Sequence, residues 1–161
     1  MIILSKMADY GVIIATQLAL DPERQMTAAS MAEQTRLPRA TVAKVLKALA
    51  HGGVVAGSRG ASGGYKLARA PEAISIATVV AAIDGEIGPT QCTIHGPSCE
   101  RTDFCSTKPH WQLINDAVGN ALSAMSLAEM VPNGLLARWA RMPPPKGPVP
   151  GEGAAPKGAM S

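Results

Sequence analysis

Aromatic side chains are scarce in this sequence: its 161 residues include one Phe, two Trp and two Tyr, or 3% aromatic residues. Apolar residues nevertheless make up 47% of the chain, so a core has to be filled by Leu, Val, Ile, Ala and Met. The length suits one domain, with or without an extension. We therefore expect one small domain with an aliphatic core.

Long apolar runs are also missing. No uninterrupted stretch reaches the roughly 20 apolar residues that a membrane-spanning helix needs. The first residues, MIILSKMADYG, contain no charged segment followed by a long apolar one, so they do not resemble a secretory signal. We therefore expect a cytoplasmic protein with no membrane partner.

Sequence signatures of enzymes are absent as well. The sequence has no glycine-rich phosphate-binding loop, no nucleophile elbow and no pair of acids placed on a shared face. Gly63 and Gly64 belong to a turn, and Asp84 and Glu86 flank Gly85 at the end of a helix. We therefore predict that the chain is not an enzyme and has no small-molecule substrate.

Positive charge is concentrated in the first half of the chain, although the net charge is only +3. Residues 1–70 contain nine Lys or Arg residues against four acids, whereas residues 71–131 contain two against seven. A basic module joined to an acidic one is typical of a nucleic-acid-binding domain fused to a second functional part.

A helix-turn-helix pattern lies within the basic half. The apolar periodicity predicts a helix over residues 5–20 and a short helix over residues 28–35, which Thr27 caps. After a three-residue break, a further helix has Pro38 at its first position and stops at Gly52. One face of this last helix carries an apolar stripe of Val42, Val45, Leu46 and Leu49.

A β-hairpin with a glycine-rich tip follows this helix. Val54-Val55 and Tyr65-Lys66-Leu67 flank the turn sequence GSRGASGG. Helix, turn, helix and hairpin in this order are typical of a winged helix-turn-helix, whose second helix enters the major groove of DNA. Six residues are placed to contact DNA, namely Arg39, Thr41, Lys44, Lys47, Arg59 and Lys66.

These six residues differ in the contact that we expect of them. The first three lie at the start of the recognition helix and can reach bases or phosphates. Arg59, at the tip of the hairpin, can reach into an adjacent minor groove, and Lys47 and Lys66 are better placed for phosphates. The alternative is a small helical domain with a solvated basic face, but a hairpin with Arg at its tip favours DNA binding.

The predicted fold is mainly α, with a winged helix-turn-helix domain over residues 1–70. A connecting helix and linker follow over 71–91, then a cysteine loop over 92–105 and a long helix over 106–131. Residues 132–161 form a Pro- and Gly-rich tail that we expect to be disordered. A heptad-like apolar seam marks residues 107–130 of the long helix, with Ile114, Val118, Ala121, Met125 and Ala128.

The chain has only three cysteines, Cys92, Cys99 and Cys105, all within the segment CTIHGPSCERTDFC. Gly, Pro and Ser between them let the loop bring three sulfur atoms to one point. Their odd number and the missing export signal disfavour structural disulfides. Three thiolates suit a metal or iron–sulfur centre, because soft sulfur ligands select such centres.

An iron–sulfur cluster held entirely by protein needs a fourth ligand. Four residues are candidates. His95 lies inside the loop, and His110 lies near the start of the long helix; Lys108 is positively charged and a poor ligand, and Asp9 is distant in sequence. The residues alone leave the choice open, and an open or water-filled fourth position is a further alternative.

Residues 1–131 resemble the IscR and NsrR proteins, which are iron–sulfur transcription regulators of the Rrf2 superfamily. The resemblance rests on the segments LSKMADYG, LPRATVAKVLKAL, SRGASGGYKLAR, AIDG and HWQLIN, together with the three-cysteine loop. Within this superfamily the chain looks most like the regulators of the sulfur-mobilisation (Suf) assembly operon.

The resemblance implies a homodimer held by the long helix, with an iron–sulfur cluster (2Fe–2S or 4Fe–4S) bound by the three cysteines. In IscR-like members the fourth ligand is a histidine three residues after the last cysteine, where this chain has Lys108. In NsrR-like members it is an aspartate in the first helix of the other subunit, and Asp9 matches that position. The resemblance therefore favours Asp9 in trans, with His110 as the second choice.

The expected function is that of a repressor that binds operator DNA and senses its signal through the cluster. Its expected targets are genes of iron–sulfur cluster assembly or iron homeostasis. Two alternatives keep the DNA-binding part and replace the cluster. One is a structural zinc site, although zinc sites favour closely spaced cysteine pairs. The other is a regulator whose thiols are oxidised rather than ligated.

Overall fold

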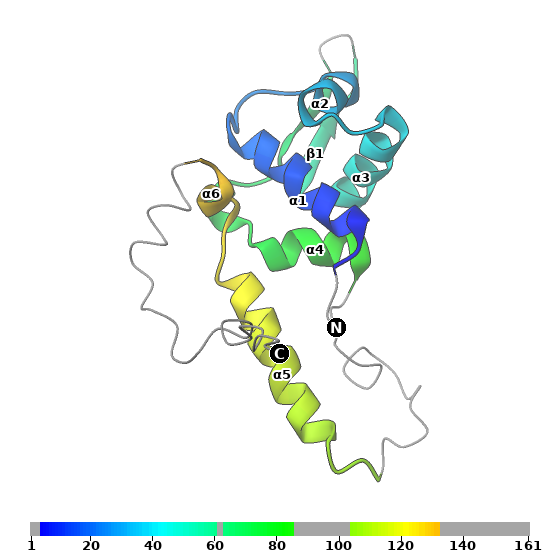
Figure 1. The fold of residues 1–161 in the computed structure, drawn as a ribbon. Coiled ribbons are helices and arrows are strands. Elements are labelled where there is room, and N and C mark those ends of the chain that lie inside the picture. The colour runs from blue at the N-terminus through cyan, green and yellow to red at the C-terminus, as the bar shows by residue number, and fades with distance from the viewer. Residues whose placement is uncertain (1–3, 61–62, 86–103, 133–161) are drawn as a thin grey trace, which may run out of the picture.

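The computed structural model describes residues 4–60, 63–85 and 104–132, and over these ranges the fold is mainly helical with one two-stranded sheet (Figure 1). The predicted tail beyond residue 132, and Cys92, His95 and Cys99 of the predicted loop, lie outside these ranges. Among the described residues, no helix has both the length and the apolar character that crossing a membrane requires. The elements are α1 (Lys6–Ala19), α2 (Ala28–Thr35), α3 (Arg39–His51), β1 (Val55–Ser58), β2 (Gly64–Leu67), the 3-10 turn η1 (Pro71–Ala73), α4 (Ile76–Asp84), α5 (Lys108–Ser123) and α6 (Leu127–Met130).

Side-chain caps set the starts of the first two helices. Ser5 Oγ accepts a hydrogen bond from the Ala8 amide at 3.0 Å, and Thr27 Oγ1 accepts one from the Ser30 amide at 3.1 Å. Each bond satisfies an amide that has no partner within its helix. The Thr27 cap and the bounds of α2 are confirmed. Pro38, predicted as the first helical residue of α3, is instead its N-cap, since its extended backbone precedes the helix.

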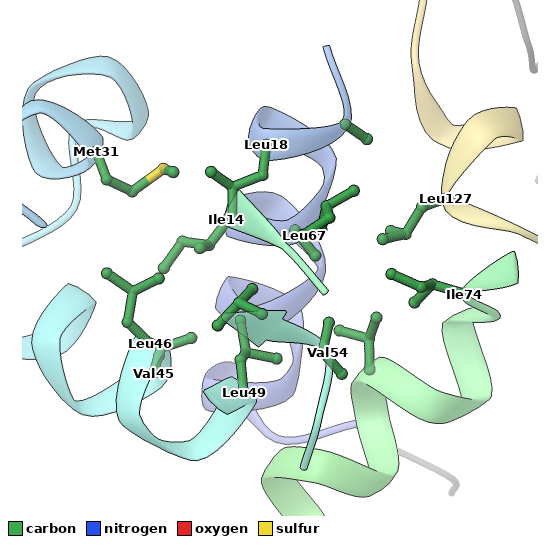
Figure 2. Packing of buried hydrophobic residues seen from close by; sticks show 14 of the residues in the cluster. Ile14, Leu18, Met31, Val45, Leu46, Leu49, Val54, Leu67, Ile74 and Leu127 are labelled. Carbon is green, nitrogen blue, oxygen red and sulfur yellow. The ribbon is translucent and has the colours of Figure 1, made fainter. Parts of the chain in front are cut away.

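The core is aliphatic, as the composition predicts. The predicted stripe on α3 is wholly buried, and it packs against Ile14 and Leu18 of α1 and Met31 of α2 (Figure 2). Within the part of the chain that the structure describes, no polar or charged residue is buried. The core therefore fixes the recognition helix through shape and apolar contact alone.

The predicted hairpin is confirmed as an antiparallel pair that runs from Val55 opposite Leu67 to Ser58 opposite Gly64. Tyr65 also exchanges two backbone hydrogen bonds with Met26, at 2.8 and 2.9 Å. A Cβ atom at Gly64 would lie 2.8 Å from the Met26 carbonyl oxygen, so this approach requires glycine. The hairpin is thereby tied to the segment that leads into α2.

The last turn of α4 packs very closely against α1 and the end of α3. A Cβ atom at Gly52 would lie 2.4 Å from Ala82 Cβ, and one at Gly11 would lie 3.0 Å from Ile83 Cγ1. Protein interiors are packed at crystal-like density, so contacts this close leave little freedom to slide. Helices α1, α3 and α4 therefore form one tightly fitted unit.

The prediction of one unbroken helix over residues 107–130 is wrong. Helix α5 ends at Ser123, and α6 begins at Leu127 after the N-cap Ser126. The break has a physical cause: Ser126 and Glu129 form a capping box, with the Ser126 amide donating to Glu129 Oε2 at 2.8 Å. The seam consequently ends within α5; of its predicted members, Met125 lies in the break and Ala128 lies in α6.

The break between α5 and α6 is held against the segment that precedes α4. The Ile76 amide donates to the Met125 carbonyl at 2.8 Å, and the Leu127 amide donates to the Ile74 carbonyl at 2.9 Å. Leu127 is fully buried beside Ile74 (Figure 2). Residues on both sides of the cysteine loop are thereby joined to one core.

Gly52→Ala should lower the free energy of unfolding by about 1–3 kcal/mol, the usual cost of overpacking. The backbone at Gly52, with φ −78°, would accept alanine, so the clash with Ala82 is the cause. Adding Ala82→Gly should recover part of the loss, which chemical denaturation of the three proteins would measure. A single variant as stable as the parent would contradict this packing.

Candidate nucleic-acid interface and metal centre

The exposed face of α3 carries cations and small side chains. Arg39, Lys44 and Lys47 are exposed, and so are Ala40 and Ala43 between them. Because alanine side chains are short, the helix backbone can approach a groove closely while the longer cations reach phosphates or bases. This face has the shape and charge of a recognition helix.

Two further features of α3 bear on its charge. Arg39 Nη2 lies 3.6 Å from Glu33 Oε1 of α2, and both side chains are about three-quarters exposed, at 75% and 72%. Ion pairs this exposed contribute little, so phosphates can compete with Glu33 for the guanidinium. Thr41, predicted to contact DNA, is half-buried and has less reach than its neighbours.

The hairpin supplies the remaining predicted DNA contacts. Arg59 directly follows β1 and is exposed, whereas Lys66 of β2 is half-buried. The tip end of the hairpin and the start of α2 line an open hollow of about 480 Å³, and Arg59 and Thr27 are among its lining residues. Arg59 is therefore presented on a second exposed element, separate from α3.

Cys105 is the one predicted cysteine ligand that lies in the described residues. It is half-buried, directly before α5, and its Sγ lies 3.2 Å from Thr107 Oγ1. Its carbonyl accepts a hydrogen bond from the Lys108 amide at 3.3 Å. Within the described ranges no three His, Cys, Asp or Glu side chains gather as a metal site, since two of the three cysteines lie outside them.

The donor set fits an iron–sulfur cluster. All three thiols of the chain fall within 14 residues, and Cys105 retains access to solvent beside a hydroxyl within hydrogen-bonding distance of its sulfur. Hydrogen bonds to sulfur are among the factors that tune such clusters. Of the candidate fourth ligands in described segments, Lys108 opens α5 and His110 is exposed in its first turn.

Asp9 and Cys105 are not brought together within one chain. Asp9 is exposed in the first turn of α1. Helix α5 extends away from the winged-helix part as an arm, and its first residues lie at the far end (Figure 1). If both residues hold one cluster, Asp9 has to come from a second chain.

A large part of α5 is apolar and exposed. Within the part of the chain that the structure describes, α5 buries none of its residues. Leu113 is 69% exposed, Ile114 43% and Trp111 37%, and Phe104 just before the helix is 92% exposed. A group of exposed apolar side chains of this size usually marks an interaction surface.

A family model described as Rrf2, iron-dependent transcriptional regulator, matches residues 4–133. The chain belongs to the Rrf2 family. Membership confirms the prediction of a winged helix-turn-helix, DNA-binding transcriptional regulator and of a protein that is not an enzyme.

Individual relatives agree with this membership. The transcriptional regulator IscR of Erwinia tasmaniensis is 28% identical over 125 residues, which cover 77% of this chain and 75% of that protein. Among solved structures, IscR of T. potens is 26% identical with a TM-score of 0.62, covering 88% of this chain and 92% of that one. CymR, the global cysteine regulator of B. subtilis, is also 26% identical, with a TM-score of 0.64 over 86% of this chain and 98% of that one. The predicted closeness to Suf-operon regulators is not tested by these comparisons and stays a prediction.

The contact between Ser5 and Asp84 is not among those predicted from the sequence. Asp84, predicted only as the end of a helix, accepts hydrogen bonds from Ser5 at the start of α1. A serine before a helical pattern is a recognisable N-cap signal, so Ser5 could have been identified as a cap. No local pattern relates it to an aspartate 79 residues away.

Lys47→Ala should weaken binding to a random-sequence DNA duplex severalfold and lower the salt dependence of log Kd by about one unit, since one phosphate contact is lost. Binding titrations at several salt concentrations would measure both effects. Lys108→Ala, at the far end of α5, is the matched control. An unchanged salt dependence for Lys47→Ala would exclude that contact.

Glu33→Gln should have the opposite effect and raise DNA affinity. Removing the carboxylate beside Arg39 leaves its guanidinium free to contact phosphate and takes away a repulsive charge. The gain should shrink at high salt and vanish in an Arg39→Ala background. Equal affinities for Glu33→Gln and the parent protein would show that Glu33 does not compete with the DNA for Arg39.

Proposed function

We propose that this chain acts as a homodimeric, cytoplasmic repressor of genes for iron–sulfur cluster assembly or iron homeostasis, with an iron–sulfur cluster as its sensor. The observation that carries the proposal is the arm formed by α5. The start of α5, which Cys105 precedes in the sequence, lies at the end of the arm away from the DNA-binding part, and α5 leaves an apolar face exposed. The family description, iron-dependent transcriptional regulator, supports the same function.

A second copy of the chain is the partner that suits the arm. Ile114, Val118 and Ala121 are spaced by four and three residues, as in helices that pack side by side. Leu113 and Trp111 widen this apolar face. Two arms packed along these residues would cover side chains that a single chain leaves in water.

The proposed ligands are the thiolates of Cys92, Cys99 and Cys105, with Asp9 of the partner subunit as the fourth and His110 as the alternative. The exposure of Asp9 in the first turn of α1 supports this assignment, because a carboxylate turned to solvent is accessible to another chain. When bound, the cluster supplies a group that iron availability, oxygen or nitric oxide can alter.

The chain's own residues link that site to DNA. Asp9 belongs to α1, whose Gly11 packs against α4, and the end of α3 packs against the same turn of α4. Release of Asp9 would free the first turn of α1, and the packed unit would pass the change to the recognition helix. DNA affinity would then depend on the state of the cysteine loop, which is a coupling between two sites.

A second function is supported by the similarity to CymR, described as a global cysteine regulator. In that case the three cysteines would respond by oxidation and would hold no iron. A structural zinc site is the third possibility and shares the same ligands. Both keep the DNA-binding part unchanged.

Anaerobic purification with iron, sulfide and zinc counts separates these functions. The proposal predicts iron and sulfide together with visible absorption, and a loss of both in Cys105→Ser. An operator fragment can be enriched from genomic DNA with the cluster-loaded and the cluster-free protein. The affinity for this fragment should change when the cluster is removed. Zinc without iron, or neither metal, would overturn the proposal in favour of one of the other two functions.

Asp9→Ala should reduce cluster retention and weaken the effect of the cluster on operator binding. Mixing Asp9→Ala with Cys105→Ser protein tests the trans arrangement, because a heterodimer retains one site in which Asp9 and all three cysteines are intact. Iron recovered in such heterodimers supports ligation across subunits. Full cluster content and normal coupling in Asp9→Ala would remove Asp9 from the ligand set.

Ile114→Glu should raise the dimer dissociation constant more than about tenfold, because burying an isoleucine-sized side chain contributes about 1.5–3 kcal/mol. Gln112→Glu, which adds the same charge on another face of α5, is the control. Light scattering at several concentrations would measure both variants. A dimer unaffected by Ile114→Glu would show that α5 does not form the interface.

A further inference from the structure

A hydrogen-bonded pair joins Ser5, the N-cap of α1, to Asp84, the last residue of α4. Asp84 Oδ1 accepts a hydrogen bond from Ser5 Oγ at 2.6 Å, and Asp84 Oδ2 accepts one from the Ser5 amide at 3.3 Å. Both oxygens of one carboxylate therefore hold a single residue. A charged acceptor makes such bonds stronger than neutral ones.

Asp84 lies at the point where α4 ends and the chain continues toward the predicted cysteine loop. Asp84 is the last residue of α4, and Gly85 turns the backbone out of the helix with φ +77° and ψ −149°, a region essentially restricted to glycine. The last residues of the predicted linker follow, and the predicted cysteine loop begins at Cys92. Asp84 and Gly85 are therefore the last described residues before the predicted linker and cysteine loop.

The same turn of α4 carries the two closest contacts of the DNA-binding part. Ala82 lies against Gly52 at the end of α3, and Ile83 lies against Gly11 of α1. Asp84 accepts a hydrogen bond from Ser5, which lies about one helical turn before Asp9. Three consecutive residues thus touch the recognition helix, the middle of α1 and the start of α1.

We propose that Asp84 is a positioning residue that transmits the state of the cysteine loop to α1 and, through the shared turn of α4, to the recognition helix. This proposal rests on the proposed function and names the regulatory contact of that same site. In this arrangement Asp9 would respond to the cluster state of the partner's cysteine loop, and Asp84 would respond to that of the cysteine loop in its own chain. The first turn of α1 is then the point at which both loops act.

The pair has the properties of a contact that switches rather than one that stabilises. Ser5 and Asp84 are both exposed, so water can replace either partner when the pair opens. The N-cap function of Ser5 does not need Asp84, because Ser5 Oγ accepts from the Ala8 amide by itself. Opening the pair therefore leaves the core and the helix cap in place.

The test compares operator Kd values of the cluster-loaded and cluster-free protein. The wild-type ratio should differ from one by at least about fivefold, as coupling between sites usually does. Asp84→Ala should keep its iron and sulfide content but bring the ratio close to one. Asp21→Ala, which removes an exposed aspartate beyond the other end of α1, should keep the wild-type ratio.

A second pair of variants keeps the helix cap and tests the contact itself. Ser5→Asp retains an N-cap residue but places a second carboxylate against Asp84, so it should also abolish the ratio. In the double variant with Asp84→Asn, the Asn amide can donate to the Asp carboxylate at position 5. The Kd ratio should then return to the wild-type value. If Asp84→Ala fails to fold, this rescue decides the proposal alone.

The outcomes separate the two proposals. The role of Asp84 is overturned if Asp84→Ala has the same Kd ratio as the wild-type protein. If the wild-type protein also holds iron and its ratio differs from one, the proposed function still stands. Loss of iron in Asp84→Ala also overturns it, because Asp84 would then help to hold the cluster. A wild-type protein without iron, or with a ratio of one, overturns both.

Discussion

The close packing of the last turn of α4 against two glycines is the constraint on which the rest of the structure depends. Gly11 and Gly52 lack the side chains that would hold α1 and α3 away from Ala82 and Ile83. Since packed interiors have no slack to absorb small shifts, the recognition helix cannot change its angle independently of α4. The core supports this fit, because none of its buried residues in the described ranges is polar or charged. The orientation of the DNA-reading face is thus determined by a helix that leads into the cysteine segment.

The second constraint is that α5 leaves most of its apolar residues exposed in its own chain. A helix that buries none of its residues in its own chain, within the described ranges, draws little stability from packing. Its exposed apolar residues, and its extension away from α1, both suit a partner chain (Figure 1). In the proposed dimer, the arm that pairs two chains would also bring the cysteine segment of one chain to Asp9 of the partner subunit. Family membership identifies the chain as a DNA-binding transcriptional regulator, and its relatives include both IscR and a cysteine regulator.

How far the sequence predicts the structure depends on whether the signal is local. Thr27 and the stripe around Val45 are set by neighbours three or four residues away, so the caps and buried face of the helix-turn-helix were predictable. The break before Ser126 also has a local signal, Ser-x-x-Glu, but the apolar period runs through it and favoured one long helix. The Ser5–Asp84 pair had no local signal at all, because only the tertiary packing of α1 on α4 brings these residues together. Asp9 could be proposed as a ligand only from the resemblance, since nothing in its own helix distinguishes it from a solvated acid.

The central claim is that the state of the cysteine loop sets the affinity of the winged helix for DNA. The most direct measurement is the operator Kd of anaerobically purified wild-type protein before and after removal of its cluster, at one fixed salt concentration. The account predicts stoichiometric iron and sulfide and Kd values that differ by at least about fivefold. Equal Kd values for the two forms, or a protein that carries no iron, would contradict it.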